Sequence, residues 1–93
     1  MGSIFEWDLS TAESNYKNFK ISFSDAASVF SDDRALTINE NRLEAQKYVI
    51  IGSTETADVL TVVFNWHSHA FQIISARKAT ESEKIAYQAT YET

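Results

Sequence analysis

The chain has 93 residues, of which 44% are hydrophobic and 13% aromatic, and this fits one small domain with a single packed core. It carries 8 lysines and arginines against 13 aspartates and glutamates, a net charge of −5. This balance argues against a surface that coats DNA or RNA broadly, because such binders gain most of their affinity by neutralising phosphates. The lack of cysteine excludes a disulfide framework and a thiolate metal site, and no apolar run is long enough to span a bilayer.

We therefore expect a single domain over residues 1–93, located in the cytoplasm, since no signal peptide is visible at the start of the chain. The first three residues, Met1-Gly2-Ser3, are either natural or a cloning remnant. They carry no part of the functional argument.

A short strand is predicted at the start, because residues 4–8 alternate between apolar and other side chains, and Trp7 is expected in the core. Two residues qualify as the cap of the helix that follows. Ser10 stands three residues before Glu13, which is the spacing of a capping box. Asp8 is the other cap, and its alternative role is to pair with a cation.

The two predicted helices are amphipathic. In the first, the apolar stripe is Ala12, Tyr16 and Phe19. The second follows a cap at Ser22, and its apolar stripe is formed by Phe23, Ala26, Ala27 and Phe30.

Four strands are predicted after a turn at residues 31–33, and they cover residues 34–38, 47–52, 59–66 and 70–76. The short polar gaps between them favour hairpins, hence an antiparallel meander. A last helix begins after Thr80, which forms a capping box with Glu83, and its apolar face is expected at Ile85, Ala86 and Ala89. The predicted fold class is α+β: a short N-terminal strand, two helices, a four-stranded antiparallel meander and a C-terminal helix.

Two adjacent cations, Arg77 and Lys78, stand between the last strand and the last helix. Side chains alternate along a strand, so the two should point to opposite faces of the sheet. One interpretation is that Arg77 holds a phosphate through its two-pronged guanidinium group. The other is that Arg77 pairs with a carboxylate such as Glu81 or Glu83.

The last hairpin contains Trp66-His67-Ser68-His69. A base can stack on the indole, and a histidine can move a proton near neutral pH, as RNA cleavage requires. The alternative is an exposed polar turn with one packed tryptophan. A zinc site is disfavoured, since His67 and His69 supply only two ligands and the chain has no further histidine or cysteine.

Two more residues have a possible role in RNA binding. Lys47 opens the second long strand and either joins the basic pocket of Arg77 or guards the strand against unwanted pairing. Tyr87 either reaches substrate beside Arg77 or packs its ring on the sheet.

Several blocks in this order resemble the BrnT family. They are Phe5-Glu6-Trp7-Asp8, Asn15, Ser22-Phe23 with Ala26, Val29-Phe30, Ile51-Gly52, the strand 60–64, and Ile74-Ser75-Ala76-Arg77-Lys78-Ala79 followed by Glu83 and Tyr87. The likeness extends from Ile4 to about Tyr87, and the block at residues 74–79 is its most specific part.

The resemblance implies a RelE-like ribonuclease toxin of a type II toxin–antitoxin pair that cuts RNA without a metal or other cofactor. Its expected partners are an RNA substrate and a ribbon-helix-helix antitoxin of the BrnA kind. DNA is contacted only indirectly, through the antitoxin complex, and no membrane is involved.

The chain departs from the family pattern mainly at basic positions. Where the family has Lys-His-Gly at the end of the first helix, this chain has Asn18-Phe19-Lys20, and a helix lysine is replaced by Thr11. Family arginines correspond here to Lys47, His67, Ala70 and Gln72. Much of the family's basic set is therefore neutral in this chain.

Three hypotheses follow. The leading one is a BrnT-like ribonuclease in which Arg77 holds the scissile phosphate with Lys47 or Lys78 in support, while His67 or His69 transfers a proton. In this hypothesis Trp66 and Tyr87 contact RNA, and Glu83 orients Arg77 or caps its helix. The second is a weakened or inactive homologue that acts as a protein-binding module, and the third is a bare structural domain.

Overall fold

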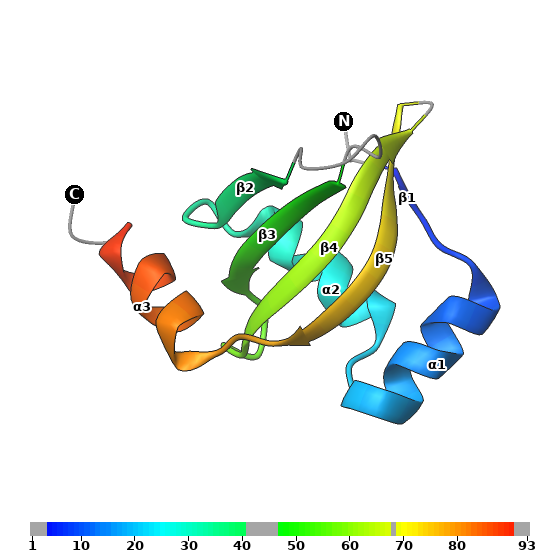
Figure 1. Ribbon diagram of the computed structural model, residues 1–93, viewed down its shortest axis with the longest axis horizontal. Coiled ribbons are helices and arrows are strands. Elements are labelled where there is room, and N and C mark those ends of the chain that lie inside the picture. The colour runs from blue at the N-terminus through cyan, green and yellow to red at the C-terminus, as the bar shows by residue number, and fades with distance from the viewer. Residues whose placement is uncertain (1–3, 41–46, 68, 91–93) are drawn as a thin grey trace.

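The computed structural model describes residues 4–40, 47–67 and 69–90, without the side chains of residues 39, 40 and 67. The elements are β1 (Phe5–Glu6), α1 (Leu9–Phe19), α2 (Phe23–Ser28), the 3-10 helix η1 (Val29–Ser31), β2 (Leu36–Glu40), β3 (Lys47–Ser53), β4 (Val59–His67), β5 (Ala70–Lys78) and α3 (Glu81–Ala89) (Figure 1). This confirms the predicted α+β fold and the order of its elements. Met1-Gly2-Ser3 lie outside the described residues.

The strands form one sheet in the order β1-β5-β4-β3-β2. Neighbouring strands from β2 to β5 pair antiparallel, which confirms the meander. The sequence did not reveal the place of β1, which pairs parallel to β5 through Phe5 with Phe71 and Glu6 with Gln72. The sheet is therefore five-stranded and mixed.

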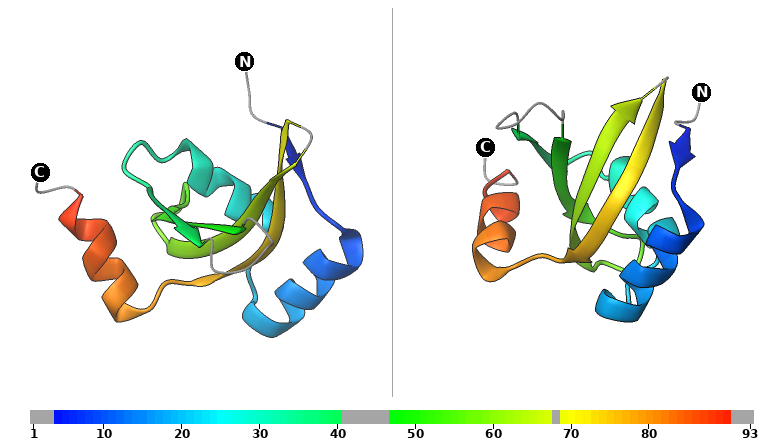
Figure 2. Two further views of the ribbon diagram at one scale, coloured as in Figure 1. Left: turned by 45° about the horizontal axis from the view of Figure 1, so that its top comes forward. Right: turned by 45° about the vertical axis from the view of Figure 1, so that its right-hand side comes forward.

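The two faces of the sheet are covered differently. In β4, Leu60, Val62 and Phe64 belong to the main core with α2, and we call this side the α2 face. The intervening residues Thr61 and Val63 lie on the opposite side, the α3 face, because successive side chains of a strand alternate. Figure 2 shows α3 on one side of the sheet and α2 on the other.

The main core is built on the α2 face. Phe23, Ala26 and Val29 from α2 and η1 pack there against buried residues of β3, β4 and β5. The predicted stripe of the second helix is confirmed in its main part, although the α-helix ends at Ser28 and continues as η1.

The helix caps explain where the helices begin. Asp8 caps α1, since its carboxylate accepts a hydrogen bond from the Thr11 backbone N–H at 3.1 Å. The alternative cap at Ser10 is wrong, because this residue lies inside the helix and its hydroxyl donates to Asp8 at 2.6 Å. The predicted caps at Ser22 and Thr80 are confirmed, the latter as a full capping box with Glu83.

Three predictions about apolar packing are wrong. Trp7 is 38% exposed and touches the core only edge-on, through Phe23. In α1 the exposed residues include Tyr16 and Phe19 of the predicted apolar stripe, and the buried one is Asn15. In α3 the predicted face of Ile85, Ala86 and Ala89 is exposed, and the buried residue is Tyr87. Both helices contact the sheet through a side other than their most apolar one.

Asn15 joins α1 to β5. Its side-chain amide donates to the carbonyls of Ala76 at 2.9 Å and Ile21 at 3.1 Å, and its oxygen accepts from the Ala76 backbone N–H at 3.0 Å. Every polar atom of this buried side chain is thus hydrogen-bonded, which is what a buried amide requires.

In the described part of the chain, none of the helices has both the length and the hydropathy needed to cross a membrane.

Candidate active site

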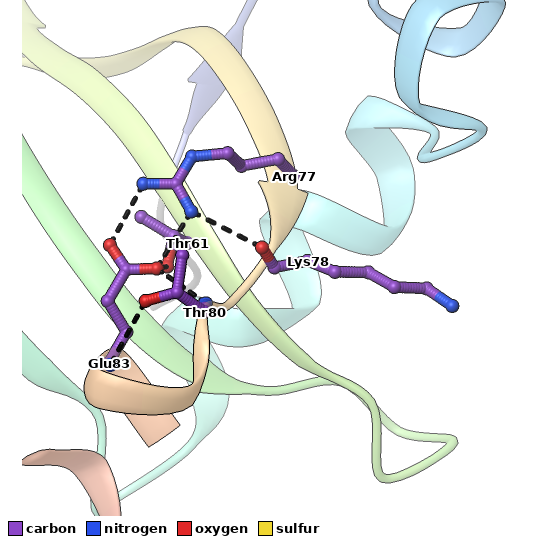
Figure 3. A network of polar contacts seen from close by, with 5 residues as sticks. All are labelled: Thr61, Arg77, Lys78, Thr80 and Glu83. Carbon is purple, nitrogen blue, oxygen red and sulfur yellow. Dashed lines mark hydrogen bonds and ion pairs between the residues drawn. The ribbon is translucent and has the colours of Figure 1, made fainter. Parts of the chain in front are cut away.

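Arg77 and Glu83 form the strongest polar cluster in the described part of the chain (Figure 3). The register places Arg77, near the end of β5, opposite Thr61 of β4. Arg77 Nη1 donates to Glu83 Oε1 at 2.7 Å and Nη2 donates to Oε2 at 2.9 Å, a two-pronged ion pair. Glu83 Oε1 also accepts from the Thr61 hydroxyl at 2.9 Å and from the Thr80 backbone N–H at 2.8 Å. Glu83 therefore fixes the orientation of Arg77 and caps α3.

These contacts favour the ionised form of Glu83. The hydrogen bond from Arg77 is the largest cause, and together with the donors Thr80 and Thr61 it outweighs burial and lowers the pKa of Glu83 from 4.5 to about 2. The same hydrogen bond raises the pKa of Arg77. A carboxylate of this kind is a poor proton acceptor near pH 7, so the cluster supplies fixed charge rather than proton transfer.

The structure confirms the carboxylate-pairing interpretation of Arg77. Its side chain is still 41% exposed, so part of the guanidinium group faces solvent. Arg77 is thus a pre-oriented cation whose two-pronged side is already used by Glu83. Its binding of a phosphate stays a prediction.

Lys78 points away from Arg77, as alternation along the strand predicts (Figure 3). It pairs in register with Leu60 of the α2 face, and it is exposed. The two adjacent cations therefore cannot both bind the same phosphate.

The hairpin between β4 and β5 lies at the other end of the sheet (Figure 1). Trp66 pairs with Phe71 and is 51% exposed, and its ring centroid is 6.3 Å from that of His69. His69 has a left-handed backbone with φ of 65°, which the tight turn imposes. The backbone of His67 pairs with Ala70, while its side chain and Ser68 lie outside the described part.

Lys47 lies at this hairpin end as well. It opens β3, whose next residue, Tyr48, pairs with Phe64 near the end of β4. It also pairs with Glu40 of β2 in register, and its side chain is exposed. Strand alternation places Lys47 on the α3 face, the same face as Arg77.

The expectation of one pocket shared by Arg77 and the hairpin is wrong. Arg77 pairs with Thr61, and His67 lies six residues farther along β4, a distance of about 20 Å at the usual rise of a strand. Trp66 is moreover on the α2 face, where it lines a hollow with Phe64 and Phe71. The predicted residues thus divide into a helix end, with Arg77 and Glu83, and a hairpin end, with Lys47, His67, His69 and Trp66.

The hairpin end of the sheet collects the four positions at which the resemblance to the family implies arginine. Lys47 opens β3, His67 pairs with Ala70, and Gln72 pairs with Asn65 across β4 and β5. We call this set of positions the corner: 47, 67, 70 and 72. Asn65 Oδ1 is buried beside it and has no hydrogen-bond partner among the described residues. Counting outward from the short gap between the two predicted strands 59–66 and 70–76 would have revealed this grouping from the sequence.

Tyr87 is 3% exposed and packs with Ile51 and Ala79 on the α3 face. This confirms the packing interpretation, and burial leaves almost no surface of the ring for RNA to touch. Its hydroxyl donates to Asp32 at 2.5 Å. Burial tends to raise the pKa of Asp32, but hydrogen bonds from Tyr87 and from the backbone of Ser53 and Arg34 bring it below its usual value. Sequence reasoning missed Asp32, which it treated only as a turn residue.

Within the described ranges, no three His, Cys, Asp or Glu side chains lie close enough together to hold a metal ion.

The comparisons with known proteins agree with this architecture. A family model described as "Ribonuclease toxin, BrnT, of type II toxin-antitoxin system" matches residues 7–83. The structure is similar to the crystal structure of the Brucella abortus ribonuclease toxin BrnT, with a TM-score of 0.66 and 22% sequence identity over 86% of this chain and 100% of that one. No curated protein matches the chain. The family match covers most of the sequence, and the chain therefore belongs to the BrnT family of ribonuclease toxins of type II toxin–antitoxin systems.

Proposed function

We propose that the chain is a cytoplasmic endoribonuclease that cuts RNA without a metal, arrests growth and is neutralised by a cognate antitoxin of the ribbon-helix-helix, BrnA-like kind. Family membership supports the ribonuclease activity and the antitoxin partner. The observation that carries the proposal is the corner, where Lys47 and the imidazole-bearing hairpin stand at the same end of the sheet.

The chemistry at the corner would be transfer of a phosphoryl group within the RNA. The 2′-hydroxyl attacks the adjacent phosphorus, the bond to the 5′-oxygen breaks, one group accepts the hydroxyl proton and another donates a proton to the leaving oxygen. His67 and His69 are the proton carriers in this proposal, since histidine is the side chain that most often serves as a general acid or base. Lys47 holds the phosphate, and Trp66 stacks on a base at the tip of the hairpin.

Arg77 would bind a phosphate upstream or downstream of the cleaved one. It shares the α3 face with Lys47, but about 20 Å of strand separates it from the hairpin. Glu83 holds its guanidinium in place, so Arg77 contributes to binding of the RNA strand rather than to bond cleavage. Lys78 faces the other side and is assigned no direct contact with this strand.

The test combines induced expression in bacteria with RNA cleavage by purified protein. We expect growth arrest and RNA breakdown for the wild type, also in the presence of a metal chelator. The double substitution His67→Ala and His69→Ala should lower kcat at least 100-fold, the usual scale of lost acid–base catalysis. Arg77→Ala should instead raise KM and leave kcat close to the wild-type value.

Lys84→Ala is the matched control, because it removes a cation from α3 that makes only a 3.8 Å contact with Glu81. Circular dichroism verifies that each variant is folded. Intact RNA with folded wild-type protein would contradict the proposal. A loss of kcat in Arg77→Ala would contradict the division between the two ends of the sheet.

The second candidate function is a protein-binding module with weakened or lost catalysis. It is favoured by the neutral residues Ala70 and Gln72 in the corner and by the pairing of Arg77 with Glu83. In that case the chain binds its antitoxin, and neither growth nor RNA changes on expression.

A further inference from the structure

The outer surface of α1 is unusually apolar for a solvent-exposed helix. Leu9 is 71% exposed, Tyr16 53% and Phe19 47%, and Trp7, just before the helix, is 38% exposed. Large apolar side chains that gather on one surface commonly mark an interaction site. Trp and Tyr are also among the residues that contribute most to binding energy in protein interfaces.

A hollow of about 560 Å³ lies beside this surface, between α1 and the start of α2. Trp7, Tyr16 and Phe23 contribute aromatic side chains to its wall, and Lys17 and Lys20 contribute cations. Lys20 Nζ lies 5.7 Å from the centroid of the Tyr16 ring, so the charge stands directly next to the apolar part. The hollow is large enough for a bulky side chain of a partner.

Charges around the hollow decide what kind of partner fits. The hollow is lined by two cations, Lys17 and Lys20, and by one carboxylate, Glu13, so its charged lining is net positive and favours a carboxylate of the partner. A second hollow adjoins at Trp7 and is lined by Glu6 and Asp8. A continuous polyphosphate strand would meet these two carboxylates, so RNA is disfavoured here. A peptide with one large apolar residue and a nearby acidic residue matches both features.

The second hollow also connects this surface with the corner. Its lining includes both Trp7 and Gln72, and Gln72 is one of the four corner positions. A protein segment that is anchored beside Tyr16 and continues past Trp7 therefore arrives next to the proposed cleavage site.

We propose that this surface of α1, formed by Trp7, Leu9, Tyr16, Lys17, Phe19 and Lys20, is where the antitoxin docks. The docking segment carries a large apolar side chain that enters the hollow and a carboxylate that pairs with Lys17 or Lys20. This inference rests on the proposed function, which supplies the antitoxin as partner. It adds the docking site, and it explains how binding on α1 would block a site on the sheet.

The test is a calorimetric titration of the full chain with a purified ribbon-helix-helix antitoxin of the BrnA-like kind. Tyr16→Ala should weaken the Kd at least tenfold, because it removes an exposed aromatic side chain that lines the hollow. Lys17→Glu should weaken it about fivefold or more at low salt, and less at high salt, because rim charges are screened. Ile85→Ala is the control, since Ile85 is also a large exposed side chain, 63% exposed, but lies on α3.

The outcome is independent of whether the chain cuts RNA. Unfolding curves verify the fold, and RNA cleavage of Tyr16→Ala should equal that of the wild type. An unchanged Kd for folded Tyr16→Ala overturns the inference, as does a wild type that does not bind the antitoxin. A loss of RNA binding or of self-association without a loss of antitoxin binding assigns the surface to another partner and also overturns it. If the wild type binds the antitoxin but does not cut RNA, and Tyr16→Ala weakens antitoxin binding, only the proposed cleavage is refuted.

Discussion

At the scale of single residues, Glu83 joins three elements of the fold. Its carboxylate accepts hydrogen bonds from β4, β5 and the start of α3, through Thr61, Arg77 and Thr80. The spacing of Thr80 and Glu83 reveals the capping box in the sequence. The contact with Thr61 comes from 22 residues away and depends on the sheet register, so the sequence alone could not reveal it.

We expect a characteristic acid sensitivity from Glu83. Its pKa is about 2 in the folded chain against 4.5 ordinarily, so the ionised group stabilises the fold above pH 4.5, and this contribution disappears as the pH falls towards 2. The loss should be about 1–2 kcal/mol, since Arg77 is partly screened by solvent. Urea unfolding between pH 7 and pH 2.5 measures it, and Glu83→Gln should lack this component. Glu81→Gln, an exposed change in the same helix, should keep the wild-type profile; identical profiles for all three chains would refute the assignment.

Asn15 provides a second residue-scale prediction. Asn15→Ala would leave the buried N–H and C=O of Ala76 and the C=O of Ile21 without their partner. Unsatisfied buried groups are costly, so we expect a loss of about 2–4 kcal/mol in the free energy of unfolding. Asn18→Ala, at an exposed position of the same helix, should change it by less than about 0.5 kcal/mol. Equal unfolding midpoints for the two variants would contradict the role of Asn15.

At the scale of elements, strands were predicted better than helix orientations. The strand predicted at 34–38 is found at Leu36–Glu40, and the one at 59–66 at Val59–His67. Alternation and short polar gaps identify strands because both are local. Helical periodicity shows which residues share a side of α1 or α3, but the direction of that side is set by long-range contacts such as those of Asn15 and Tyr87.

Close packing between η1 and β3 leads to the element-scale prediction. A Cβ on Gly52 would lie 2.8 Å from Val29 Cγ1, closer than real Cβ contacts allow, and 3.0 Å from Ala35 Cβ, which is tighter than most of them. Gly52→Ala should therefore push η1 away from the sheet and cost about 1–3 kcal/mol of stability, as overpacking does. Ser82→Ala, at an exposed site in α3, is the control for thermal unfolding. If Gly52→Ala is as stable as the wild type in thermal unfolding, η1 moves away from the sheet without a cost in stability, and the prediction is wrong.

At the scale of the whole molecule, the sequence predicts one basic site, whereas the structure divides its residues between two ends of the sheet. The sequence placed Arg77 and His67 together because they are close to the same predicted strand. The antiparallel pairing of β4 and β5 puts them at opposite ends. The net charge of −5 makes the placement of each remaining cation decisive, since the molecule as a whole repels RNA.

This charge distribution predicts a gain of function. Gln72→Arg adds a cation to the corner, opposite Asn65, and should raise kcat/KM for RNA cleavage about tenfold, given that a hydrogen bond to a charged group contributes about 1.5–3 kcal/mol. Gln88→Arg adds the same charge to the exposed side of α3 and should change it less than twofold. If both variants gain equally, net charge rather than the corner controls the activity.

The side chain of Asn15 has one more consequence, which concerns how the sheet can grow. By holding both the N–H and the C=O of Ala76, its carboxamide imitates the peptide group of an adjacent strand beyond the point where the two-residue β1 ends. A strand of another molecule therefore meets backbone groups of Ala76 that are already hydrogen-bonded on this edge of β5. At the other margin, β2 pairs with β3 alone among the described strands. Fibre formation or strand exchange between copies should therefore start from β2, with Asn15 acting as a terminator on the opposite side.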